Sequence, residues 1–102
     1  MTIGLSPGSI PHLPRGVRVH HDRIRKAHVL LAPERAFDLD THALEVLRLV
    51  DGRRSIHEIA SDLAARFDAD RAVIEADVIE MLNGLLNRRI LGATNLESDQ
   101  KP

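Results

Sequence analysis

The chain has 102 residues, enough for one domain with a single hydrophobic core. Its 14 basic and 15 acidic side chains nearly balance, so no charge excess favours binding to nucleic acid or to an anionic membrane. The absence of cysteine excludes disulfides, thiolate catalysis and cysteine-ligated metal sites, and the lack of aromatic residues other than two phenylalanines excludes a base-stacking surface for single strands.

Both ends of the chain are predicted to be weakly ordered. Residues 1–14 form a flexible N-terminal arm in this interpretation, because they are rich in proline and glycine and show no hydrophobic period. Residues 92–102 form a polar, disordered tail. The folded domain is therefore expected over 15–91. No membrane span or signal sequence is recognisable, so a cytoplasmic location is expected.

The first third of the expected domain has the pattern of β-strands. Residues 17–22 and 35–39 alternate along the chain, and residues 26–32 are largely β-branched or aliphatic. Pro33 fits a turn because it cannot donate a hydrogen bond to a neighbouring strand. The short connections favour antiparallel neighbours. We therefore predict a three-stranded antiparallel β-meander.

Three helices are predicted in the rest of the domain. Asp40 or Thr41 begins the first helix, and Ser55 with Glu58 forms a capping box at the start of the second. Asp70 caps a longer third helix. The element order predicts an α+β fold in which the meander is followed by a three-helix bundle.

The third helix carries a wide apolar arc of about 160°, whereas a helix that lies on one core needs about 100°. One interpretation is a central helix that contacts both the sheet and its helical neighbours. The other is that one edge of the arc lines a groove for an apolar ligand or a peptide. One sector holds Ile74, Val78, Met81 and Leu85, and the arc extends to one side through Ile79, Leu82 and Leu86.

The strand predicted at 35–39 has an open edge, for which two interpretations exist. Arg35 and Asp38 are charges of the kind that protect an edge strand from unwanted pairing. The same edge is also a template on which an extended peptide can add as another strand. The pattern alone favours protection over recruitment.

Patterns typical of an enzyme are lacking. None of the six histidines pairs with another at the i, i+4 spacing of two metal ligands on a helix. Asp77 and Glu80 lie on the polar face of the third helix, where carboxylates are normally solvated. There is no nucleophile elbow and no glycine-rich phosphate loop. We expect no catalytic residue, no metal and no cofactor.

Two other functions are compatible with this element order. The second and third helices could form the helix-turn-helix of a winged-helix DNA-binding regulator, but the acidic start of the third helix would repel the duplex. The acidic side chains at this helix start are Asp68, Asp70, Glu75, Asp77 and Glu80, against Arg71 alone.

The second alternative is a homodimeric structural or interaction domain that pairs through the open strand edge.

The sequence resembles the pyrroloquinoline quinone (PQQ) biosynthesis protein D family, PqqD, over about residues 11–91. The resemblance is carried by "GVR" with Asp22 after it, then by "VLLAPER", "LVDGRRSIHEI" and "DVIEML", in that order. His21 departs from the family, which commonly has an aromatic residue there.

The resemblance implies a non-catalytic peptide chaperone with a winged-helix-like fold, which is a recognition element for ribosomal precursor peptides. Such a protein presents the precursor to a radical S-adenosylmethionine (SAM) enzyme that crosslinks a glutamate and a tyrosine. In related elements the peptide pairs with the third strand beside the third helix. The expected peptide-binding residues are Arg35, Ala36, Phe37, Asp38 and Leu39 on the strand and Ile79, Leu82 and Leu86 on the helix. The backbone groups of Arg35, Phe37 and Leu39 are expected to pair with the peptide.

Overall fold

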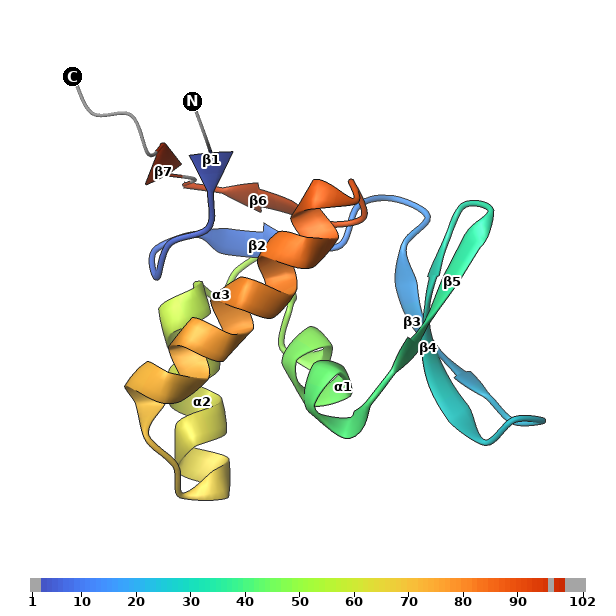
Figure 1. The fold of residues 1–102 in the computed structure, drawn as a ribbon, viewed down its shortest axis with the longest axis horizontal. Coiled ribbons are helices and arrows are strands. Elements are labelled where there is room, and N and C mark those ends of the chain that lie inside the picture. The colour runs from blue at the N-terminus through green and yellow to red at the C-terminus, as the bar shows by residue number, and fades with distance from the viewer. Residues whose placement is uncertain (1–2, 96, 99–102) are drawn as a thin grey trace.

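The computed structural model describes residues 3–95 and 97–98 (Figure 1). Within these residues the chain folds into short strands at both ends, a central sheet and three helices. The elements are β1 (Ile3–Gly4), β2 (Ile10–His12), β3 (Arg18–Asp22), β4 (Ala27–Ala32), β5 (Arg35–Leu39), α1 (Thr41–Arg48), α2 (Ile56–Phe67), α3 (Arg71–Asn87), β6 (Gly92–Thr94) and β7 (Glu97–Ser98).

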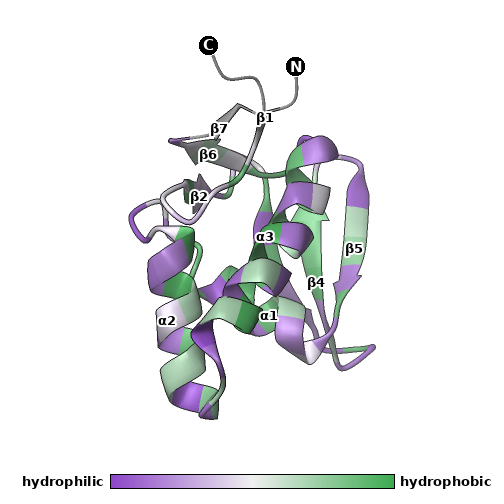
Figure 2. Cartoon of the chain, turned by 60° about the vertical axis from the view of Figure 1, so that its left-hand side comes forward, coloured by the Kyte–Doolittle hydropathy of each residue, from purple (hydrophilic) through white to green (hydrophobic). Residues whose placement is uncertain are grey.

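The central sheet is antiparallel with the order β3-β4-β5, which confirms the predicted meander. Leu30 on the middle strand is fully buried and lies opposite Val19 on β3 and Phe37 on β5. Helix α1 contacts β3, β5 and α2, so it joins the sheet to the helices (Figure 1). The apolar strand β4 lies next to β5 in Figure 2, and α1 contacts β5.

The predicted helix starts are confirmed. The Asp40 carboxylate accepts a hydrogen bond of 2.8 Å from the backbone N–H of Ala43, which satisfies an amide at the start of α1. Ser55 and Glu58 form the reciprocal capping box of α2, and Asp70 caps α3. These local interactions fix where each helix begins.

The core is aliphatic, and it lies where the helices meet β4. It includes the fully buried Leu30, Ile56, Ile59 and Leu82, with Val78 and Ile90 almost completely buried. None of the helices among the described residues is both long and apolar enough to cross a lipid bilayer.

The ends of the chain differ from the prediction of a flexible arm over 1–14 and a disordered tail over 92–102. β2 pairs antiparallel with β6, and β1 pairs with β7. Ser9 is completely buried, and its Oγ accepts a hydrogen bond of 2.9 Å from the Ser6 N–H and donates one of 2.8 Å to the Asn95 carbonyl. Residues 1–2, 96 and 99–102 lie outside the described residues.

The N-terminal segment also contributes to the start of α2. The backbone N–H of Ile56 donates to the Ser9 carbonyl, and that of His57 donates to the Pro7 carbonyl, both at 2.9 Å. Amides in the first turn of a helix have no partner within the helix, so these carbonyls satisfy groups that would otherwise need water. The segment therefore belongs to the folded domain.

Candidate functional site

Strand β5 leaves one edge of the central sheet open, because β4 is its only partner among the described strands. Phe37 and Leu39 are half-buried and pack against the core, whereas Ala36 and Asp38 are exposed. Asp38 forms an ion pair with Arg25 at 3.0 Å, and both side chains are largely exposed. This pair matches the protective interpretation of the charge on β5, but it leaves the backbone edge uncovered.

The register of the β4–β5 hairpin identifies which backbone groups face the open edge. Ala32 lies opposite Arg35 across a two-residue turn in which Glu34 has a φ of 63°. Such a turn is closed by a hydrogen bond between its first and fourth residues, which makes Ala32 and Arg35 a bonded pair. Since bonded and non-bonded pairs alternate in an antiparallel ladder, the backbone groups of Ala36 and Asp38 point outward. The sequence led us to expect that the backbone groups of Arg35, Phe37 and Leu39 face outward. In the register of the hairpin these groups face β4 instead.

The edge of α3 nearest β5 is formed by Met81, Leu85 and Arg88, which are spaced by four and three residues and so share one face. Arg35 Nη2 donates a hydrogen bond of 3.1 Å to the carbonyl oxygen of Arg88. The Arg88 guanidinium also lies 5.6 Å from the centre of the Phe37 ring. These contacts fix β5 beside the C-terminal end of α3.

The three helix residues expected at the peptide site do not lie on the edge of α3 beside β5. Leu82 is fully buried in the core, so its side chain has no access to the surface. Ile79 and Leu86 lie on the opposite edge of α3, on the side of Asn83. Asn83 Oδ1 accepts a hydrogen bond of 3.2 Å from the backbone N–H of Leu5, which places that edge against the N-terminal segment. The wide apolar arc is therefore explained by a central helix with neighbours on two sides.

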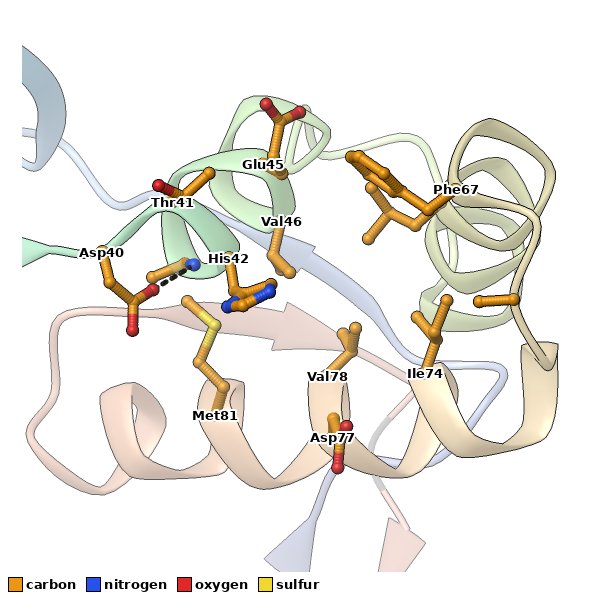
Figure 3. A pocket seen from close by; sticks show the side chains of 13 residues that line it. Asp40, Thr41, His42, Glu45, Val46, Phe67, Ile74, Asp77, Val78 and Met81 are labelled. Carbon is orange, nitrogen blue, oxygen red and sulfur yellow. Dashed lines mark hydrogen bonds between the residues drawn. The ribbon is translucent and has the colours of Figure 1, made fainter.

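A cavity of about 560 Å³ lies between α1, α2 and the N-terminal half of α3 (Figure 3). Met81, Val78 and Ile74 point from α3 toward α1, and Phe67 points across from α2. Phe67 is 56% exposed, which is unusual for a phenylalanine and reflects its place at this opening. Asp40 also lines the cavity and directly follows the last residue of β5, so the cavity continues from one end of that strand.

Sequence reasoning did not assign this cavity, although one signal for it was present. Ile74, Val78 and Met81 belong to the narrow sector of the apolar arc that was recognised in the sequence, and the cavity opens above that sector. His42 and Phe67, from α1 and α2, complete the wall, and only the tertiary structure brings them there (Figure 3).

The pKa of one histidine beside the site is shifted. His28 lies opposite Leu39 in the register of β4 and β5, and its ring centroid is 4.6 Å from that of His21. Desolvation, followed by the charges of His21 and Arg48, lowers the pKa of His28 below its ordinary value of 6.5. No group of three histidine, aspartate or glutamate side chains suited to a metal ion occurs in the described part of the chain.

The fold and the edge strand define a small α+β recognition domain, and the comparisons with known proteins agree with this class. The family model for coenzyme PQQ synthesis protein D (PqqD) matches residues 27–91. The chain belongs to the PqqD family, as the resemblance in its sequence motifs indicated.

Two relatives match most of this chain. The chain is 53% identical over 88 residues to the PqqA binding protein of Xanthomonas euvesicatoria, covering 86% of this chain and 96% of that one. It is 55% identical over 86 residues to the bifunctional coenzyme PQQ synthesis protein C/D of Methylorubrum extorquens. That match covers 84% of this chain but only 23% of the longer protein.

Two solved structures resemble the fold. The first is the solution structure of the PqqD truncation of Methylobacterium extorquens PqqCD, described as a stand-alone RiPP recognition element (RiPP, ribosomally synthesised and post-translationally modified peptide). It has a TM-score of 0.76 and 53% identity and covers 86% of this chain and 94% of that one. The second, the crystal structure of PqqD from Xanthomonas campestris, has a TM-score of 0.54 and 50% identity and covers 84% and 96%. The predicted α+β, winged-helix-like fold is confirmed.

Proposed function

We propose that this protein binds the ribosomal precursor peptide of PQQ biosynthesis, the counterpart of PqqA, and presents it to the enzyme that modifies it. The observation that carries the proposal is the open edge of β5, which lies beside an apolar cavity and has no partner among the described strands. Relatives named PqqA binding protein and a solved RiPP recognition element of the same family support the peptide as the ligand.

The proposed binding mode is strand addition. The precursor peptide lies along β5 in an extended conformation, and its backbone pairs with the outward N–H and C=O groups of Ala36 and Asp38. Alternate peptide side chains then face Phe37 and Leu39, or enter the cavity beside Met81. The proposed site keeps Arg35–Leu39 from the sequence-based expectation. It replaces Ile79, Leu82 and Leu86 with Met81 and Leu85.

The chemistry in this proposal belongs to a partner enzyme. A radical SAM enzyme would crosslink a glutamate and a tyrosine of the bound precursor, and the protein itself would have no catalytic residue. A free precursor is expected to be disordered and to lose conformational entropy on binding, so the affinity need not be extreme. Holding the peptide beside the enzyme raises its effective concentration there. We place this role in the cytoplasm, where the precursor is made.

Titration calorimetry with a synthetic PqqA peptide and a scrambled peptide of the same composition tests the proposal. Saturable binding of the PqqA peptide alone, at about one peptide per chain, is the expected result. Equal binding of both peptides, or binding of neither, would overturn it.

The open edge of β5 also favours one other candidate, a homodimer in which two copies pair their β5 strands. Sedimentation over a range of protein concentrations distinguishes the two. A dimer that dissociates when the PqqA peptide is added would show that both partners use the same edge, whereas a monomer at all concentrations would exclude the dimer.

A further inference from the structure

The proposed peptide site carries opposite charges at its two ends, and we infer that it selects precursor peptides by the order of their charges. The bound segment would carry a lysine or arginine about five residues before an aspartate or glutamate. This inference rests on the proposed function and adds to it a rule for the sequence of the ligand.

The basic end lies where β5 begins and α3 ends. The guanidinium carbons of Arg35 and Arg88 lie 5.5 Å and 5.6 Å from the centre of the Phe37 ring. Arg35 donates to the backbone carbonyl of Arg88, and neither arginine forms an ion pair with a carboxylate of the described residues. Two positive charges therefore meet around one aromatic ring without an anion to balance them, which favours a carboxylate from the ligand.

The acidic end lies at the cavity, where β5 ends. Asp77 is exposed on α3, lines the cavity, and has no ion-pair partner in the part of the chain that the structure describes. Asp40 lies across the opening, where its carboxylate caps α1. By contrast, Glu45 is held by Arg66 at 3.1 Å and by Arg48 at 3.8 Å. Asp40 and Asp77 are thus the carboxylates available to a cation of the ligand.

The dimensions of the site give the spacing of the two charges. Asp77 and Arg88 are eleven residues apart on the sequence, which corresponds to about 16 Å along a helix that rises about 1.5 Å per residue. An extended peptide rises about 3.3 Å per residue, so about five peptide residues cover that length. One residue near the acidic end and one about five positions away near the basic end can therefore be neutralised by the same bound segment.

The direction of β5 gives the order of the charges. The strand runs from Arg35, at the basic end, to Leu39, at the acidic end. Both strand pairs of the central sheet are antiparallel, and an added strand that continues this arrangement runs opposite to β5, from the cavity toward the two arginines. Its cation consequently precedes its carboxylate. A segment with the reverse order would place like charges together at both ends.

A charge scan of the peptide combined with two variants of the protein tests this inference. Each lysine, arginine, aspartate and glutamate of the synthetic PqqA peptide is replaced in turn by glutamine, and each peptide is titrated against the wild-type chain, Asp77→Asn and Arg88→Gln. Glu80→Gln, on the polar face of the same helix, and Arg53→Gln, an exposed arginine of the α1–α2 loop, are the matched controls. Circular dichroism checks that each variant is folded.

We expect that replacing one cation or one carboxylate of the peptide weakens binding by about two- to fivefold, because exposed ion pairs contribute little. The sensitive cation should precede the sensitive carboxylate by about five residues. The loss from the cation should be smaller in Asp77→Asn, and the loss from the carboxylate should be smaller in Arg88→Gln, because Asp40 and Arg35 remain at the two ends. Both losses should persist in full in the controls. Higher ionic strength should reduce both effects.

The outcomes separate this inference from the function on which it rests. A PqqA peptide that does not bind the wild-type chain overturns the proposed function and the inference together. A peptide that binds, but whose charged residues show no coupling to Asp77 and Arg88 or couple in the reverse order, overturns only the charge rule.

Discussion

The guanidinium of Arg35, the first residue of β5, donates a hydrogen bond of 3.1 Å to the carbonyl oxygen of Arg88 at the end of α3. Carbonyls at a helix C-terminus have no partner within the helix, so this bond satisfies one of them. It also holds the open strand at a fixed position beside the helix that forms the other side of the proposed peptide site.

Replacing Arg35 with methionine should lower the free energy of unfolding by about 1 kcal/mol, because the bond to Arg88 and the stacking on Phe37 are both lost. Urea unfolding followed by circular dichroism measures this, with Arg53→Met as the control for loss of an exposed arginine. Equal stability of the two variants would show that the Arg35–Arg88 contact contributes nothing.

Proline substitutions along β5 should distinguish its two sets of backbone groups. Ala36→Pro removes an N–H that faces the open edge, so the protein should stay folded but bind the PqqA peptide much more weakly. Phe37→Pro removes an N–H that is bonded to β4. It should destabilise the protein by about 3 kcal/mol or more, the cost of a proline that breaks a hydrogen bond inside a helix. Thermal unfolding and peptide titration of both variants test this. The opposite pattern would show that the backbone groups of Arg35, Phe37 and Leu39 face outward.

Neighbouring residues on α3 should respond differently to substitution. Leu82→Ala should cost about 2–5 kcal/mol of stability, because it leaves a cavity in the core. Met81→Asp should leave the fold largely intact and weaken binding of the PqqA peptide, since Met81 lines the cavity. Val73→Asp is the matched control on the same helix, because Val73 is 59% exposed. Unchanged peptide binding by Met81→Asp would exclude the cavity from the site.

Acidification should destabilise the protein through His28. Its pKa is lower in the folded state than the ordinary 6.5, so the unfolded chain takes up the proton more readily. The contribution of this histidine is therefore absent above pH 6.5, and stability is lost as the pH falls from 6.5 toward the folded pKa. Urea unfolding of wild type and His28→Gln from about pH 5 to pH 8 measures it, with exposed His20→Gln as the control. An unchanged pH slope in His28→Gln would contradict this assignment.

Ser9 tests whether the N-terminal segment belongs to the fold. Ser9→Ala removes a buried hydroxyl that joins the Ser6 amide to the Asn95 carbonyl, so both groups lose a partner. The expected loss is about 1–3 kcal/mol of unfolding free energy. A flexible arm would instead tolerate the change without cost, as Ser61→Ala at a half-buried position within α2 should do nearly.

The helix starts were predictable because each depends on residues that are close in sequence. Ser55 and Glu58, for example, satisfy each other's amides across a single turn. The folding of both ends into strands was not predictable, because β2 pairs with a strand about eighty residues away and the burial of β2 depends on that pairing. Proline and glycine there indicated disorder, whereas Pro11 is in fact fully buried within β2.

The candidate site was predictable in part. Alternation and the short connections indicated that β5 is an edge strand, and this is what the sheet shows. A helical period gives the width of the apolar arc of α3 but not its rotation relative to the sheet. That rotation depends on contacts such as Arg88 with Phe37 and Asn83 with Leu5, which only the folded chain reveals. For this reason the sequence suggested Leu82, which is buried in the core, where the proposed site has Met81, which lines the cavity.

The pairing of β1 with β7 brings the two ends of the domain together on the side away from β5 (Figure 1). A second domain joined to either end would emerge on that side of the molecule and leave the open strand accessible. Fusion of a partner domain at either end would therefore require no change in the proposed peptide-binding surface.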